Sequence, residues 1–170
     1  MGVYRERCSE KYHPKWESLA TSGLKYTEID NGISVIGYVG TATEVVIPES
    51  VDEKPVIEIA EKAFYENTSI TSVTILDSVT SIGDYAFYYC ESLTSITIPD
   101  SVTSIGSFAF LYCSCLASIT VSVGNSNYKD IDGNLYTKDG KTFVQYAIGK
   151  TATSFAIPDS VTSIGYGAFY

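Results

Sequence analysis

The side chains that most often carry chemistry are few in this sequence. The one histidine, His13, stands near the N-terminus. No serine or cysteine can be assigned to it as a nucleophile, with a third group to orient the pair. A lone histidine in such a segment is more often solvated than catalytic. We therefore predict that the chain has no catalytic residues and is not an enzyme.

The segment from Asp130 to Asn134 begins like a calcium-binding loop. Its sixth position, which needs glycine for the sharp turn, is Leu135. Its twelfth position, which needs a bidentate glutamate, is Lys141. The sequence also has no glycine-rich nucleotide-binding motif and no zinc-ligand spacing. The prediction is therefore no metal site and no cofactor.

Cysteine is the remaining reactive residue type, at Cys8, Cys90, Cys113 and Cys115. The same interval separates Asn67 from Cys90 and Cys90 from Cys113. The functional alternative is a disulfide or a metal pair, but a disulfide would not tolerate asparagine at the equivalent position. A small buried side chain beside backbone groups that need a partner would tolerate either type. We predict a buried structural ladder of Asn67, Cys90 and Cys113, with Cys115 more exposed.

This 23-residue interval is the period of an internal repeat. The hexapeptide SVTSIG begins unchanged at Ser78, Ser101 and Ser160, so the first two copies lie one period apart and the third follows after a longer spacing. Because no single unit has enough apolar residues for a core, the units must stack and bury one continuous core between neighbours. Each unit has an Ala-Phe pair at the same phase, and we place these phenylalanines in the core: Phe64, Phe87, Phe110 and Phe169.

Each unit also contains a short stretch with the two-residue alternation of a β-strand. In the segment from Ile96 to Ile98, both isoleucines are predicted to point inward and Thr97 outward. Pro99 then ends the strand, since it has no amide hydrogen for a sheet ladder. The Ala-Phe segment, which follows a glycine in the intact units, predicts a turn or a single helical turn.

The pattern CxxLxxIxIPxxVxxIxxxAF, repeated at this period, resembles the BspA-like leucine-rich repeats of bacterial surface proteins, over residues 45–170. The resemblance implies a β-rich α/β solenoid, a right-handed superhelix of short parallel strands with turn or short-helix returns. It also implies a cell-surface or secreted protein with a binding or adhesion role. No signal peptide is visible in the chain, so this localisation rests on the resemblance alone.

The N-terminal part lies outside the repeats. Residues 1–23 fit no repeat unit. Residues 24–44 alternate apolar and polar types around Asp30-Asn31-Gly32, which is a strong hairpin signal. A solenoid needs a cap over its first unit, and we predict that this β-hairpin is the N-terminal cap.

The repeat domain, residues 45–170, carries an insertion at about residues 122–154. A second alternating stretch inside it surrounds Asp139-Gly140 and predicts another hairpin. Insertions of this kind are frequent binding elements, although most are tolerated decoration of one coil.

Charge narrows the choice of partner. The formal net charge is −9 at pH 7, so nucleic acid and anionic lipid surfaces are repelled. No apolar run is long enough to span a bilayer, which predicts no membrane insertion. The expected partner is a host or cell-surface protein, with a glycan as the alternative, and the acidity favours a basic partner.

The candidate binding surface consists of repeated positions predicted to face outward. One group combines polar strand residues with the acidic residues after each strand. The simpler interpretation of the acidic residues is that they satisfy backbone hydrogen-bonding groups in the turn after the strand. The other group is tyrosine beside the Ala-Phe pairs, a residue type that gives large contact area at small entropic cost. The surface comprises Thr74, Thr97, Thr120, Ser72, Ser95, Ser118, Asp77, Asp100, Tyr88, Tyr89 and Tyr112.

The predicted function is a non-enzymatic binding or adhesion module that presents a leucine-rich-repeat surface to a protein or glycan. The alternative is a structural spacer or self-assembling repeat fragment with no specific ligand. The last unit stops after Phe169-Tyr170, which predicts an uncapped apolar end and homo-association through it. Ice binding is a remote third hypothesis, since three threonines at equivalent strand positions are too few for the flat array that ice binding requires.

Overall fold

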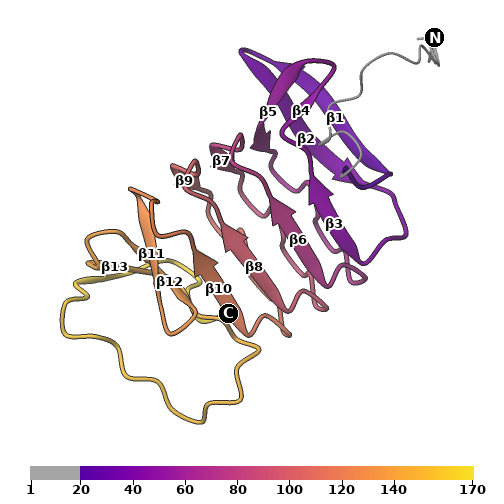
Figure 1. Ribbon diagram of the computed structural model, residues 1–170. Coiled ribbons are helices and arrows are strands. Elements are labelled where there is room, and N and C mark those ends of the chain that lie inside the picture. Colours follow the sequence, from indigo (N-terminus) through magenta and orange to yellow (C-terminus); the bar gives the residue numbers. More distant parts are fainter. Residues whose placement is uncertain (1–19) are drawn as a thin grey trace.

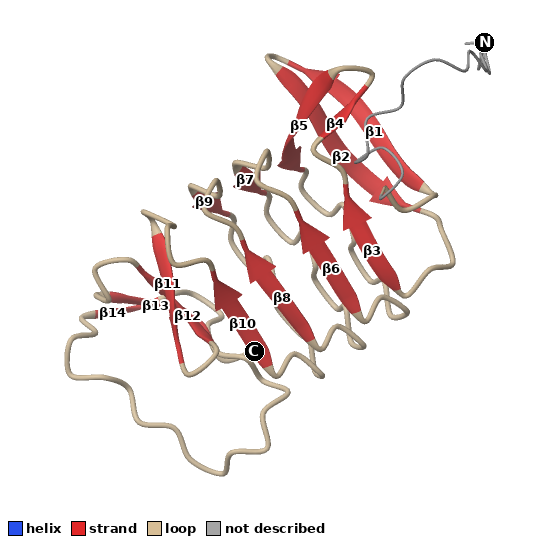
Figure 2. Ribbon diagram, in the orientation of Figure 1, coloured by secondary structure: helices blue, strands red, loops and turns tan. Residues whose placement is uncertain are grey.

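The computed structural model describes residues 20–170, and His13 and Cys8 lie outside the described residues together with most of the non-repeat segment. Within the described residues the structure has fourteen strands and no helix. The strands stack side by side into an elongated solenoid, and turns and loops connect them (Figures 1 and 2). The β-rich solenoid predicted from the repeats is therefore present.

One face of the solenoid is a parallel sheet built from the alternating stretches. Its neighbours, in order, are β3 (Glu44–Ile47), β6 (Ser72–Ile75), β8 (Ser95–Ile98) and β10 (Ser118–Val121). Equivalent repeat positions pair with one another, as Ser72 does with Ser95 and Ser95 with Ser118. Ile96 and Ile98 are buried and Thr97 is exposed, as the two-residue period requires.

A second row of strands forms another side of each coil. β1 (Leu24–Ile29) and β2 (Gly32–Tyr38) form an antiparallel hairpin whose turn includes Asn31 at a φ of 69°. β2 then pairs in parallel with β5 (Lys54–Ile59), which is followed by β7 (Ser81–Ile82) and β9 (Ser104–Ile105). The two-residue β4 (Ser50–Val51) pairs back onto β5. The hairpin thus extends this sheet beyond β5, and its role as a cap stays a prediction.

We number the repeat units by their strands. The first unit contains β3 and β5, the second β6 and β7, and the third β8 and β9. The fourth contains β10 and the insertion strands, and the fifth contains β14 (Ser163–Ile164). The insertion strands β11 (Tyr128–Ile131), β12 (Asn134–Thr137) and β13 (Thr142–Gln145) are consecutive and antiparallel, and β14 pairs in parallel with β13.

The segment that begins like a calcium loop is a hairpin turn. Asp132 and Gly133 join β11 to β12 with φ angles of 50° and 70°. The same hairpin lies along the outer edge of β10, where the Ile119 amide donates to the Gly133 carbonyl and the Val121 amide to the Asp130 carboxylate. Because that edge is occupied, residues 151–162 form no strand, although they repeat the strand motif, and follow a wide loop (Figure 1).

One continuous core runs between the stacked units. The rings of Phe64 and Phe87 stack with centroids 5.1 Å apart, and those of Phe87 and Phe110 at 5.6 Å. All three side chains are at most 2% exposed. Phe87 therefore has an aromatic neighbour from the unit before it and another from the unit after it.

The prediction that Phe169 belongs to this core was wrong. Its side chain is 44% exposed. The ring contacts Phe143 and Tyr146 of the fourth unit, with centroids 5.0 and 5.7 Å away. No later unit within the described residues covers its other side, and burial in a solenoid requires a neighbour on both sides.

The Ala-Phe segments are tandem turns, so the predicted short-helix returns and the α part of the fold class were wrong. In the first unit, the amide of Ala63 donates to the carbonyl of Ala60, and that of Tyr65 to the carbonyl of Lys62. Two positions in each of the first three units have a left-handed backbone: Lys62 and Glu66, Tyr85 and Tyr89, and Phe108 and Tyr112. A helix needs right-handed dihedrals throughout, so these residues prevent one. The right-handed sense of the superhelix stays a prediction.

The two cysteines of the repeat are buried free thiols. The thiol of Cys90 donates to the Phe64 carbonyl, and that of Cys113 to the Phe87 carbonyl, each at 3.1 Å. Asn67 holds the same position in the first unit, where its side-chain oxygen accepts the Ile70 amide. Each side chain at this position therefore satisfies a backbone group. Burial raises the pKa of Cys90 to about 12 and also raises the pKa of Cys113.

These thiols should differ sharply in reactivity from Cys115, which is exposed. The thiolate is the reactive form, and a raised pKa keeps Cys90 and Cys113 neutral at pH 8. We expect an aromatic disulfide reagent to modify Cys115 in the native protein, and to modify Cys90 and Cys113 only after denaturation without reductant. A disulfide between Cys90 and Cys113 in the mass spectrum of the unreduced protein would contradict the ladder.

The core assignment predicts a large difference between two single substitutions. Phe87→Ala should lower the free energy of unfolding by about 3–5 kcal/mol, because it leaves a cavity between two stacked rings. Thr97→Ala, on the exposed face of β8, should change it by no more than roughly 0.5 kcal/mol. Chemical denaturation of both variants measures this difference, and a more damaging Thr97→Ala would reverse the inward and outward assignment.

Candidate functional site

The tandem turns hold a continuous array of aromatic side chains at the surface. The repeat stacks residues of equal phase over one another, so rings from successive units come into contact. We call this array the aromatic face. It comprises eight rings, those of Tyr65, Tyr85, Tyr88, Tyr89, Phe108, Tyr112, Tyr166 and Tyr170.

Tyr88 lies at the centre of the aromatic face. Its ring stacks on Tyr65 of the first unit at 4.8 Å and meets Tyr85 of its own unit edge-on at 5.7 Å. Tyr112 of the third unit approaches it edge-on at 5.6 Å and also contacts Tyr89 at 5.7 Å. These are the offset and edge-to-face arrangements that aromatic pairs prefer, so the rings hold one another in place.

The aromatic face continues past the insertion to the fifth unit. Phe108 stacks on Tyr85 at 5.1 Å and meets Tyr166 edge-on at 5.3 Å. Tyr170 contacts Tyr112 at 6.4 Å. A hollow of about 240 Å³ lies among these side chains, with Leu111 and Gly167 completing its wall.

Much of this aromatic area is open to solvent. Tyr65, Tyr89 and Tyr112 are each 40% exposed, and Tyr166 and Tyr170 are 88% and 63% exposed. The outer sides of these rings face solvent in the described structure. Contiguous exposed apolar area of this kind marks interaction sites in soluble proteins.

The face is electrically neutral at its centre with charged groups at its edge. Partial desolvation, with Glu66 contributing, raises the pKa of Tyr65, and desolvation and Tyr112 raise the pKa of Tyr88. These phenols therefore remain protonated at neutral pH and can donate hydrogen bonds. Lys62 lies 5.7 Å from the centre of the Tyr85 ring and pairs with Glu61 at 2.9 Å.

The remaining residues of the predicted surface lie elsewhere on the coil. Thr74, Thr97 and Thr120 are exposed on the sheet of β6, β8 and β10, with Thr97 opposite Thr120. The serines Ser72, Ser95 and Ser118 form the neighbouring row, exposed or half-buried. The structure brings Tyr88, Tyr89 and Tyr112 together on the turns and leaves this polar group on the strands.

The carboxylates of Asp77 and Asp100, which follow β6 and β8, make no hydrogen bond within the described residues. Asp77 and Asp100 are both exposed. It is Ser101 that satisfies backbone at this corner, since its hydroxyl donates to the Val79 carbonyl at 2.6 Å. The structure therefore gives Asp77 and Asp100 neither a turn-closing role nor a place in the aromatic face.

Sequence reasoning missed the rings that complete the face. Phe108 lies one 23-residue period after Tyr85. Tyr166 follows Ser107 at the longer spacing that separates the second and third SVTSIG copies. Repeat phase was thus a usable signal. Phe108 was missed because only tyrosines were considered beside the Ala-Phe pairs. Tyr166 and Tyr170 were missed because they belong to the last unit, which was predicted to be an uncapped end.

Groups that could hold a metal ion are not found in residues 20–170, where no three histidine, cysteine or acidic side chains cluster. In the same residues no helix is long and apolar enough to cross a membrane.

Comparison with known proteins identifies the repeat. The sequence matches the model of the BspA type leucine rich repeat region in six copies over residues 38–138, starting in β2. No curated protein sequence matches the chain significantly.

Several solved structures share the fold. A leucine-rich repeat protein of T. pallidum is 30% identical with a TM-score of 0.62, over 94% of this chain and 66% of that chain. One from Bacteroides ovatus is 27% identical with a TM-score of 0.60, over 86% of this chain and 37% of that one. One from Bacteroides capillosus is 28% identical with a TM-score of 0.56, over 85% and 94%. This chain therefore spans less than two thirds of the T. pallidum and B. ovatus proteins.

The resemblance found in the repeat pattern is confirmed by the family model, which covers more than half of the chain. The chain belongs to the BspA-type leucine-rich-repeat family, and its stacked units are copies of that repeat.

Proposed function

We propose that this chain is a non-enzymatic binding module whose aromatic face contacts a partner protein. The observation that carries the proposal is the set of exposed, mutually packed rings from Tyr65 to Tyr170. Tyrosine rings held rigidly lose little conformational entropy on binding and bury large amphipathic area. Tyrosine is also enriched among the residues that dominate binding energy at protein interfaces.

Charge points to the kind of partner. The chain carries a net charge of −9, and Glu66 and Asp84 flank the tyrosines of the face in sequence and are exposed. A basic surface beside an apolar contact would complement this arrangement and speed association. The family supports a location at the cell surface or outside the cell, where such a module would act in adhesion. The same net charge repels nucleic acid and anionic lipid.

Removing two central rings should abolish binding without unfolding the protein. Both Tyr89 and Tyr112 have a left-handed backbone, which asparagine tolerates better than most residues. We expect the Tyr89→Asn, Tyr112→Asn double variant to lose at least about tenfold in affinity for whatever the native chain retains. The measurement is capture of the monomer on an array of extracellular-matrix proteins, serum proteins and glycans.

The matched control for that experiment changes the strand face. Thr97→Ala with Thr120→Ala alters two exposed residues of β8 and β10 and should leave capture unchanged. The opposite result, with capture lost only in the threonine variant, would move the binding surface to the strands. If the native monomer captured nothing on the array, the alternative of a structural spacer would stand.

Self-association is a second proposal, and the exposed apolar side chains of the fifth unit favour it. Ile157, Ile164 and Phe169 are 41%, 51% and 44% exposed. In the described structure β14 pairs with β13 along one edge and with no strand along the other. An unpaired edge beside apolar surface favours joining of two copies.

A charge placed on that edge should prevent association. The native chain should form dimers or larger species in sedimentation velocity at several hundred micromolar, and Ile164→Lys should remain monomeric because lysine opposes edge pairing. Ile36→Lys, at an isoleucine of the N-terminal hairpin that is 46% exposed, is the control and should associate like the native chain. A native chain that stays monomeric throughout would refute the proposal.

A further inference from the structure

The tandem turns of neighbouring units are joined by a regular ladder of backbone hydrogen bonds. The amides of Tyr85 and Phe87 donate to the carbonyls of Ser107 and Ala109, at 3.0 and 2.8 Å. One unit earlier, the amides of Lys62 and Phe64 donate in the same way to Asp84 and Ala86, at 3.0 and 2.8 Å. Amides two residues apart thus meet carbonyls two residues apart.

The ladder is interrupted after the third unit. Phe108 and Phe110 are the next residues in phase, yet neither amide donates a hydrogen bond within residues 20–170. Tyr112, two residues further on, donates to the Tyr170 carbonyl of the fifth unit at 3.4 Å. The third unit therefore presents two adjacent rungs of the ladder without acceptors.

The cause is a shortened turn in the fourth unit. The Phe143 carbonyl accepts the Gly165 amide, as the Ile82 carbonyl accepts that of Gly106, so Phe143 and Ile82 are equivalent. The Tyr146 amide donates to the Ala168 carbonyl, as that of Phe87 donates to Ala109. Tyr146 comes three positions after Phe143, whereas Phe87 comes five positions after Ile82. The fourth unit therefore lacks two residues of the turn.

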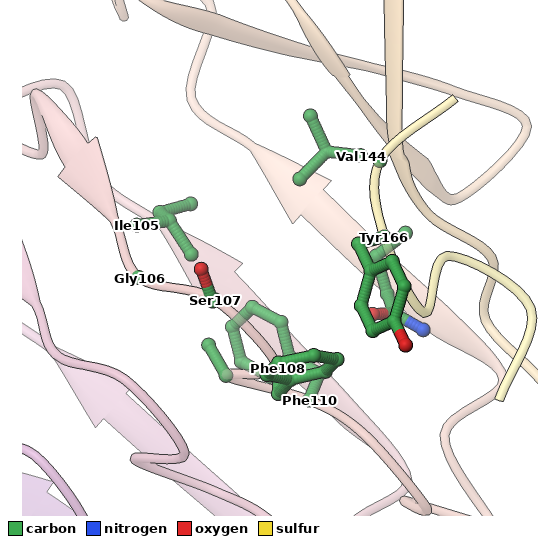
Figure 3. Close-up of a pocket in the computed structure, with 10 residues that line it drawn as sticks. Ile105, Gly106, Ser107, Phe108, Phe110, Val144 and Tyr166 are labelled. Atoms are coloured by element: carbon green, nitrogen blue, oxygen red, sulfur yellow. The ribbon is translucent and has the colours of Figure 1, made fainter. Parts of the chain in front are cut away.

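A notch of about 180 Å³ lies where those residues would be. Figure 3 shows the third unit, from Ile105 to Phe110, on one side and Val144 and Tyr166 on the other. The Phe108 ring belongs to the aromatic face and meets Tyr166 at the notch. The notch therefore combines two backbone donors with aromatic walls.

We propose that this notch binds the main chain of a segment of a partner protein. The Phe108 and Phe110 amides donate to two carbonyl oxygens of that segment, two residues apart, and the segment completes the ladder as the turn of a regular next unit does. The inference rests on the proposed function, since it names the chemistry by which the partner is recognised. The molecule itself contains the same contact one unit earlier, because Ser107 and Ala109 present such carbonyls to the second unit.

Electrostatics decide between a neutral carbonyl and a free carboxylate. The Asp84 carboxylate contacts one of the residues that line the notch, since it accepts the Ser107 amide at 2.6 Å. With this charge and a net charge of −9, an anionic group would be repelled. Peptide carbonyls accept hydrogen bonds without charge, and a basic side chain next to them would find Asp84.

Amide NMR of the isotope-labelled full chain tests the proposal directly. The probe is a capped peptide that copies residues 106–112 with a lysine added at each end. Its binding should move the Phe108 and Phe110 amide resonances downfield, and should slow their hydrogen exchange toward that of Tyr85 and Phe87. The control is the same peptide with esters at the two linkages that carry the acceptor carbonyls, because an ester carbonyl is the weaker acceptor.

Three variants separate the notch from the rest of the aromatic face. Tyr166→Ala removes an exposed wall of the notch and should weaken the peptide at least about tenfold, whereas Tyr65→Ala, at the far end of the face, should not. Insertion of two residues between Val144 and Gln145 restores the turn length and should abolish peptide binding.

The outcomes distinguish this inference from the proposed function. Unmoved Phe108 and Phe110 resonances at saturating peptide would overturn the notch, even if array capture still depended on Tyr89 and Tyr112. The same shifts produced by raising the concentration of the chain alone would assign the notch to a second copy and overturn the partner segment.

Discussion

Contact between units of equal phase is the interaction on which the rest of the molecule depends. No unit has a core of its own, and Phe87 is buried only because Phe64 and Phe110 cover its two sides. Backbone ladders in the strands and in the turns hold that stacking in register. The same register that buries one phenylalanine over another brings Tyr65, Tyr88 and Tyr112 into contact outside.

The tandem turns connect core stability to the exposed surface. Each uses two residues with a left-handed backbone, which costs roughly 1–2 kcal/mol for a residue other than glycine. Tyr85, Phe108, Tyr89 and Tyr112 hold such positions, whereas Gly167 holds one in the fifth unit. Lys62 and Glu66 hold the same two positions in the first unit, so the left-handed backbone belongs to the repeat itself. The inter-unit hydrogen bonds fix the conformation, so the rings are presented on a rigid support.

The insertion changes two features of the stacking at once. Its hairpin occupies the outer edge of β10, which leaves residues 151–162 without a strand partner. Its return through β13 is two residues too short for the turn ladder, which leaves the Phe108 and Phe110 amides without acceptors among residues 20–170. The shortened fourth unit thus creates the notch beside Tyr166. The notch is the part of the aromatic face that differs most from a regular solenoid.

The sequence by itself determined which residues share a phase. From the 23-residue period it was possible to predict the strand at Ile96–Ile98 and the burial of Phe87 and Cys90, because a side chain that recurs at one phase meets the same environment in every coil. The repeat family came from the resemblance of the repeated motif. Only the tertiary structure decided the rest. The choice of turns over short helices depends on left-handed residues such as Tyr85, which inter-unit hydrogen bonds select and local propensity does not. The unpaired amides of the notch, within residues 20–170, depend on the length of the turn in the next coil, and periodicity carries no information about a neighbouring turn that is shortened.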